Sequence, residues 1–172
     1  MQPEELYELD TEDTPGLQGA ALLVYLEGFM DAGAAGRLVT EHLLDAFEHK
    51  TVARFDTDRL LDYRSRRPLM MFDDGKWESY DAPELCVFQV ADSAGKPFLL
   101  LTGPEPDHEW EGFVSATMSL ADRLGAGPMI TYFGVPMGIP HTRPLGVITH
   151  SSRPGLVTSK VPLPSKIGRA HV

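Results

Sequence analysis

The sequence predicts an α/β domain in which helices flank a mostly parallel sheet. Apolar runs of strand length, the first of them Ala20–Leu26, lack polar alternation, which is typical of strands buried on both faces. The patterns follow in the order strand, helix, strand, paired strands, helix, strand, and that order indicates a layered fold. A length of 172 residues fits one domain or a large piece of one.

The predicted elements follow one another without an internal repeat. Residues 1–18 form an acidic lead-in with Leu6-Tyr7 as an apolar anchor, and the α/β domain spans residues 19–157. Asp74-Gly75 between two partly apolar stretches predicts a hairpin. In chain order, we expect a strand at 20–26, a helix from 32 to about 49, strands at 51–56, 85–90 and 97–102, a helix behind an Asp107 N-cap with one apolar stripe (Trp110, Phe113, Val114, Met118, Ala121 and Leu124), and a strand at 129–135.

Charge is distributed unevenly along the chain. The net charge is −10, but residues 1–122 carry 25 acids and 9 bases, whereas residues 123–172 carry 6 bases and no acid. Affinity for nucleic acid needs clustered Lys and Arg, so the acidic body argues against nucleic acid as the partner. The six bases near the end are spread over fifty residues and do not form such a cluster.

Composition also limits the compartment and the cofactors. Cys86 is the only cysteine, which excludes an internal disulfide framework and a cysteine-based zinc site. The apolar runs are too short to cross a bilayer, and the first residues are acidic where a signal peptide would be basic. These features predict a cytoplasmic protein with no membrane partner, no metal and no cofactor.

The last residues lack the apolar pattern that predicts helices and strands in the rest of the chain. The apolar pattern decays after Val157, and we expect residues 158–172 to be a non-native or disordered tail. The final six residues match the translation of a common sequencing adapter, which predicts that the domain is incomplete at its C-terminus. The alternative is a natural flexible tail. The six residues are Ile167-Gly168-Arg169-Ala170-His171-Val172.

Six residues are candidates for ligand binding, each with a structural alternative. Asp31 follows the first strand and precedes a helix, so it caps that helix or binds a ligand at its start. Arg64 and Arg66 share a side if their segment is extended, and they either clamp an anion or form internal ion pairs with Asp58, Asp62 or the acids at the start of the second helix. The other candidates, expected from the C-terminal edge of the sheet, are Glu105, His141 and Arg143.

Enzymatic signatures are weak. The sequence has no Gly-x-Ser-x-Gly elbow for a nucleophilic serine, and its Gly28–Gly33 turn matches neither a dinucleotide fingerprint nor a phosphate loop. Cys86 falls within a predicted strand, which favours a small buried side chain over a nucleophile. We therefore name no catalytic residue.

Four strings, taken together, resemble one family, the proteasome assembly chaperone 2 family in its actinobacterial branch. The resemblance extends from about residue 5 to residue 157. The strings are Leu26-Glu27-Gly28-Phe29-Met30-Asp31-Ala32-Gly33, Asp62-Tyr63-Arg64-Ser65-Arg66-Arg67-Pro68, Phe98-Leu99-Leu100-Leu101-Thr102-Gly103-Pro104-Glu105-Pro106-Asp107, and Gly134-Val135-Pro136-Met137-Gly138-Ile139-Pro140-His141-Thr142-Arg143-Pro144.

The resemblance implies a three-layer, phosphorylase-like or hydrolase-like core and a native chain about twice as long. It implies a non-enzymatic assembly protein that forms homo-oligomers, trimers in bacterial relatives, with proteasome subunits as possible partners. The family's C-terminal docking motif of a hydrophobic residue, Tyr and any residue is absent from Ala170-His171-Val172. The alternative function is a small-molecule-binding protein or enzyme that uses the phosphorylase-like cleft, since fold alone does not decide function.

Overall fold

The structure is a computed structural model that describes residues 3–10, 15–28 and 30–157. The chain divides into two units, Met1–Pro136 and Met137–Val172, which are treated separately. The described part of the second unit, residues 137–157, forms turns and irregular chain without a helix or strand. The predicted tail at 158–172, including 167–172, lies outside the described residues.

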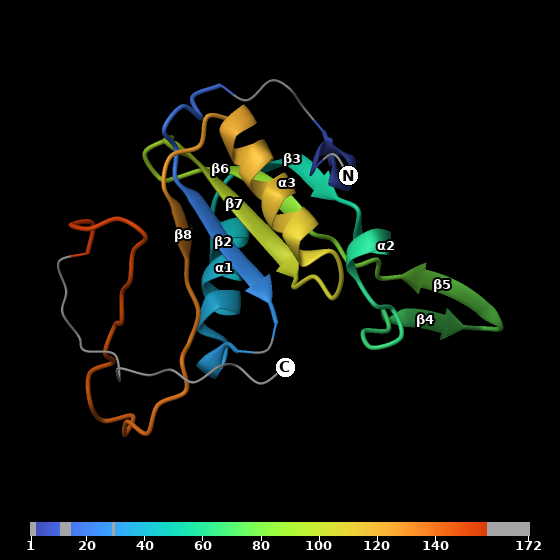
Figure 1. The fold of residues 1–172 in the computed structure, drawn as a ribbon. Coiled ribbons are helices and arrows are strands. Elements are labelled where there is room, and N and C mark those ends of the chain that lie inside the picture. The colour runs from blue at the N-terminus through green and yellow to red at the C-terminus, as the bar shows by residue number, and fades with distance from the viewer. Residues whose placement is uncertain (1–2, 11–14, 29, 158–172) are drawn as a thin grey trace. The chain divides into compact units, whose positions relative to one another are not determined.

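The first unit contains a six-stranded sheet (Figure 1). The strands lie in the order β1-β3-β6-β7-β2-β8, and a separate hairpin pairs β4 with β5. The elements are η1 (Pro3–Leu6), β1 (Tyr7–Leu9), β2 (Leu22–Glu27), η2 (Ala32–Ala34), α1 (Ala35–Ala46), β3 (His49–Phe55), α2 (Thr57–Leu60), β4 (Met70–Asp73), β5 (Lys76–Tyr80), β6 (Cys86–Ala91), β7 (Pro97–Pro104), α3 (Trp110–Arg123) and β8 (Met129–Thr131).

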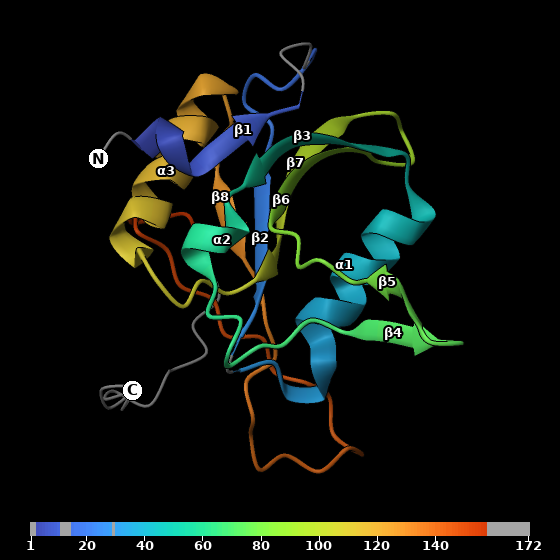
Figure 2. The ribbon, with the colours of Figure 1, turned by 90° about the vertical axis from the view of Figure 1, so that its right-hand side faces the viewer.

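The α/β class and the three layers are confirmed. Figure 2 shows α1 on one side of the sheet and α3 on the other. The sheet is mixed rather than mostly parallel: β2 runs parallel to β7 and β8, whereas the pairs β1–β3, β3–β6 and β6–β7 are antiparallel. The physical reason is clearest at β6–β7, where the turn Asp92–Lys96 is too short for the crossover that parallel strands require.

The core lies mainly on the side of the sheet that α3 covers. Phe113, Ala116 and Leu120 of α3 are buried in one apolar cluster with strand residues such as Leu99 and Leu101. Leu6 and Tyr7, the predicted anchor, are buried in the same cluster. The lead-in therefore contributes a strand, β1, to the edge of the sheet.

The apolar stripe predicted along α3 divides into two rows. One row, which includes Phe113 and Leu120, is buried, and Leu124 just past the helix is buried with it. The other row, Trp110, Val114 and Met118, remains 41%, 53% and 50% exposed. The sheet covers only one side of α3. The side chains of the second row, which follow one another at intervals of four residues, therefore point away from the sheet.

The hairpin predicted at Asp74-Gly75 is confirmed by β4 and β5. Both turn residues have positive φ, 43° for Asp74 and 77° for Gly75, which is the backbone of the tight turn that Asp-Gly favours. All nine strand residues of the hairpin are exposed.

Candidate functional site

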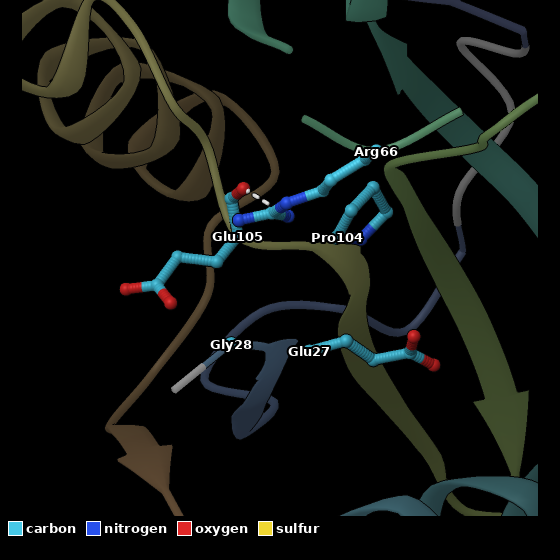
Figure 3. A pocket seen from close by; sticks show the side chains of 5 residues that line it. All are labelled: Glu27, Gly28, Arg66, Pro104 and Glu105. Atoms are coloured by element: carbon cyan, nitrogen blue, oxygen red, sulfur yellow. Dashed lines mark hydrogen bonds between the residues drawn. The ribbon is translucent and has the colours of Figure 1, made fainter. Parts of the chain in front are cut away.

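A hollow of about 450 Å³ lies where the adjacent parallel strands β2 and β7 end (Figure 3). Glu27 and Gly28 line it at the end of β2, Pro104 and Glu105 at the end of β7, and Arg66 from the loop after α2. The Glu105 amide donates to the Glu27 carbonyl at 2.9 Å, which keeps the two strand ends together. The carboxyl ends of parallel strands are the usual place for a ligand in α/β proteins.

Arg66 joins two loops beside this hollow. Its Nη1 donates to the Glu105 carbonyl at 2.7 Å, and its Nη2 lies 3.1 Å from Asp107 Oδ1. The other Asp107 carboxylate oxygen accepts the Asp62 amide at 2.9 Å. Arg66 thus forms an internal ion pair with the acidic segment before α3, which was the structural alternative to an anion clamp.

The electrostatics of the hollow are acidic. Arg66 is paired with Asp107, so the charges that remain at the lining are the carboxylates of Glu27 and Glu105. In Figure 3 these two side chains point in opposite directions. They are therefore not arranged as a pair that shares a proton, and the hollow offers little attraction for a phosphate.

Arg64 does not join Arg66. The chain turns at residues 62–66, where the amides of Ser65 and Arg66 both donate to the Asp62 carbonyl at 3.0 Å. The extended segment that would place the two arginines on one side is absent from this turn. Arg64 is exposed, and its amide donates to Asp62 Oδ1 at 2.9 Å.

Asp31 lies just before α1, and its carboxylate accepts hydrogen bonds from several parts of the protein. Its carboxylate accepts the amides of Gly36 and Arg37 in the first turn, at 2.9 and 3.0 Å, as a cap would. It also accepts the Gly134 amide at 2.8 Å and the Tyr25 hydroxyl at 3.0 Å. These four hydrogen bonds hold the helix, strand β2 and the segment after β8 together.

The titration of this cluster reflects its hydrogen bonds. Burial by itself would raise the pKa of Asp31, but the three backbone amides and the Tyr25 hydroxyl lower it from 3.8 to about 2. Burial, and then the hydrogen bond to Asp31, raise the pKa of Tyr25 to about 12. Asp31 is therefore an anion at all ordinary pH values, and its lone pairs are occupied by the protein.

The acidic segment before α3 has a different geometry from the one predicted. Asp107 is not the N-cap, because α3 begins at Trp110 and Glu109 occupies the capping position in a left-handed conformation, φ 52°. Glu109 instead binds Arg59, with 2.7 Å between Oε2 and Nη2. Among the described residues, no cluster of His, Cys, Asp and Glu is placed to hold a metal ion.

Of the six predicted site residues, the structure brings together two. Arg66 and Glu105 line the same hollow, whereas Asp31 and Arg64 lie elsewhere in the first unit. His141 and Arg143 belong to the second unit, where both are exposed and the Arg143 amide donates to the Pro140 carbonyl at 3.0 Å. A role in ligand binding stays a prediction for all six.

A second, smaller hollow of about 230 Å³ lies between α1 and the sheet. Leu44, Cys86 and Phe88 supply its apolar lining. Burial raises the pKa of the Cys86 thiol to about 11, so the sulfur is a protonated, buried thiol rather than a nucleophile.

Sequence reasoning missed the apolar surface as a functional feature. Trp77 is 66% exposed and Leu69 77% exposed on or beside the hairpin, and Trp110 lies on the exposed row of α3. The signal was present in the string Leu69-Met70-Met71-Phe72, whose four consecutive apolar residues cannot all face a core from one strand.

Comparisons with known proteins agree with this fold. A Mycobacterium tuberculosis protein of unknown function is 47% identical, with a TM-score of 0.80, over 89% of this chain and 54% of that chain. A Corynebacterium glutamicum protein of unknown function is 40% identical, with a TM-score of 0.75, over 81% of this chain and 54% of that chain. The chain thus spans about half the length of these two proteins, and no curated protein matches it.

A more distant structure has the same fold. A Mycobacterium tuberculosis proteasome-assembly chaperone homologue is 23% identical, with a TM-score of 0.67, over 72% of this chain and 53% of that chain, which shows a shared fold. The model of the PAC2 family matches residues 25–170. The resemblance found in the sequence is confirmed, and this chain belongs to the PAC2 family.

Proposed function

We propose that this protein is a non-enzymatic binding and assembly protein related to proteasome assembly chaperones. The observation that carries the proposal is the row Trp110, Val114 and Met118, which leaves large apolar side chains exposed along one helix. Apolar side chains at positions i, i+4 and i+8 form a continuous surface of the kind that one protein chain presents to another.

The contacts that two candidate ligand-binding residues make within the protein support the same proposal. Asp31 is occupied by four donors within the protein, and Arg66 is occupied by Asp107 and the Glu105 carbonyl. Charged residues that hold loops and helix ends together are what a binding scaffold needs. No step of chemistry is required to explain them.

The comparisons support the partner class that we propose. One structure of the same fold is a proteasome-assembly chaperone homologue, and proteasome subunits are the partners that we propose for this chain. We further propose a cytoplasmic location, self-association, and no nucleic-acid or membrane partner, in keeping with the excess of 16 acids over residues 1–122. None of the helices in the described ranges has the length and hydropathy to span a bilayer.

Binding to purified proteasome subunits tests the proposal. The immobilised chain is expected to retain actinobacterial α- or β-subunits, and Val114→Ser with Met118→Ser is expected to weaken retention at least tenfold. The control is Trp77→Ser, which removes another exposed apolar side chain, on the hairpin. Failure of the unmodified chain to retain either subunit, or equal retention by the α3 variant, would refute the proposal.

A second candidate is a small-molecule-binding protein or enzyme that uses the hollow between β2 and β7. Its volume and its place at the strand ends favour this alternative. The lining carboxylates of Glu27 and Glu105 favour a neutral or cationic ligand over a phosphate. Thermal shifts with nucleosides, polyamines and inorganic phosphate separate the alternatives, because only a genuine site raises the melting temperature and loses that effect in Glu105→Gln.

A further inference from the structure

Helix α1 covers its side of the sheet incompletely and leaves the hollow of about 230 Å³ beside it. The helix meets the sheet closely near its start, where the Tyr25 ring occupies the place that a side chain at Gly36 would need. Further along the helix, Thr40 and Leu44 line the hollow instead of filling it. Protein interiors are normally close-packed, so a gap of this size between a helix and a sheet is room for a ligand.

The floor of this hollow is apolar. Cys86 and Phe88 are two positions apart on β6, so their side chains point to the same side of the sheet. Leu44 approaches them from α1. A cavity of about 150 Å³ with aliphatic and aromatic walls is large enough to hold benzene. The hollow beside α1 therefore has room for an apolar group of that size and for a short chain attached to it.

The rim of the same hollow is acidic. Its carboxylates are those of Glu27 at the end of β2, Glu41 on α1 and Glu84 just before β6. Arg37 pairs with Glu41 at 2.7 Å, and Arg54 pairs with Glu84 at 3.0 Å. Glu27 forms no ion pair with any residue in the described part of the chain. The rim thus keeps a negative charge that the protein does not neutralise.

The direction of Glu27 places this charge at the mouth of the hollow. Glu27 follows Tyr25 by two positions, so its side chain leaves β2 on the side that faces α1. Figure 3 shows it pointing away from Glu105, which lines only the other hollow. Thr102 is the neighbour of Tyr25 in the parallel pair of β2 and β7, and it lines the hollow too. Its hydroxyl adds a second acceptor close to the carboxylate.

We propose that the hollow beside α1 binds a small primary amine, with an apolar body against Leu44 and Phe88 and an ammonium group on Glu27. An ammonium group has three donors and no acceptor, so a carboxylate and a hydroxyl suit it. The acidic rim repels a carboxylate or a phosphate. Apart from Glu27, this site shares no residue with the hollow at the ends of β2 and β7. The inference does not depend on the proteasome-related function.

Calorimetric titration with 2-phenylethylamine at pH 7 tests the site. We expect saturable binding at one site per chain, with a dissociation constant in the millimolar range or tighter. Two compounds with the same aromatic body separate the contribution of the charge. The neutral 2-phenylethanol should bind at least tenfold more weakly, and the anion 3-phenylpropionate should not bind. Absence of saturable amine binding, or equal binding of the alcohol, would overturn the proposal.

Three charge-neutralising variants locate the amine. Glu27→Gln should weaken amine binding at least fivefold and leave the weak binding of 2-phenylethanol unchanged. It should melt normally, because Glu27 is exposed. The matched control is Glu78→Gln, which removes an exposed carboxylate from the hairpin and should bind the amine normally. Glu105→Gln separates the two hollows, and a loss of amine binding in this variant would place the ligand at the ends of β2 and β7 and refute the site beside α1.

Nuclear magnetic resonance provides a location that needs no substitution. Addition of 2-phenylethylamine should shift the amide signals of residues 40–44 of α1 and 86–88 of β6. Shifts confined to other parts of the chain would overturn the proposal.

The same ammonium chemistry is available from a free amine and from a lysine side chain of a partner protein. We assign the site to a free amine, because the apolar floor accommodates a ring and a lysine carries only a narrow aliphatic stem. Nα-acetyl-lysine methylamide should therefore compete only weakly with 2-phenylethylamine. Competition at equal concentrations would overturn this assignment and identify a partner's lysine as the ligand.

Discussion

Replacing Asp31 by Asn should destabilise the fold in a pH-dependent way. The carboxylate accepts the amides of Gly36, Arg37 and Gly134 and the Tyr25 hydroxyl, all within 3.0 Å. Asn keeps the shape and one acceptor oxygen but loses the charge. Its amide nitrogen cannot accept the hydrogen bonds that the second carboxylate oxygen receives.

The magnitude follows from the pKa of Asp31. Its decrease from 3.8 to about 2 corresponds to about 2.4 kcal/mol at neutral pH, at 1.36 kcal/mol for each pKa unit. Because Asp31 is partly exposed, solvent screening reduces the expected cost of Asp31→Asn to about 1.5 kcal/mol. The folded pKa lies below the unfolded value, so this stabilisation is complete above about pH 4 and is lost as the pH falls toward 2.

Urea unfolding of both proteins at pH 7, 4 and 2.5 measures the effect. We expect the difference in unfolding free energy to be largest at pH 7 and to shrink steadily as the pH falls below 4. The control is Asp74→Asn, which removes a carboxylate from the exposed hairpin turn and keeps a residue suited to positive φ. A difference that is equal at pH 7 and 2.5, or no difference at pH 7, would refute the role of the charge.

Three further experiments have expected outcomes. Arg66→Met should lower the free energy of unfolding by about 1 kcal/mol, since the lost ion pair is partly exposed. It should also speed amide hydrogen exchange over residues 62–68. Unchanged exchange would contradict the role of Arg66 in holding this loop in place. Gly134→Ala should be severely destabilising in thermal melts because its Cβ meets the Ala32 backbone, whereas Gly28→Ala meets only a flexible carboxylate and should melt nearly normally. Cys86, with a pKa of about 11 and 2% exposure, should react with thiol reagents only in denaturant; labelling of the folded chain would contradict its burial.

The parts of the fold that could be predicted are those with local signals. Ala20–Leu26 predicted β2, and Asp74-Gly75 predicted the tight turn, because backbone conformation there depends on adjacent residues. The mixed sheet could not be predicted, because strand direction depends on pairing between segments far apart. The short strand β1 was hidden in an acidic segment, where only Leu6 and Tyr7 signal burial.

The candidate site was predictable to a similar degree. The alternation of Arg64 and Arg66 suggested a shared side, but the Asp62 carbonyl turns the chain and separates them. Asp31 was expected to cap the helix that follows it; Ala34 instead holds the N-cap position of α1, although the Asp31 carboxylate accepts amides of its first turn. The bond from Asp31 to Gly134, 103 positions away, required the tertiary structure. The exposed row on α3 could not be separated from the buried row, since both are apolar and only packing distinguishes them.

The place of β2 between β7 and β8 affects how the chain is made. Leu22 pairs with Leu99, which is 77 positions later (99 minus 22), and with Met129, which is later still. The ribosome adds about 5 to 20 residues each second, so the interval between the synthesis of β2 and that of β7 is roughly 4 to 15 s. During that time the apolar segment Leu22–Leu26 has neither of its neighbours, and the nascent chain depends on its acidic surroundings or on cellular chaperones to avoid aggregation.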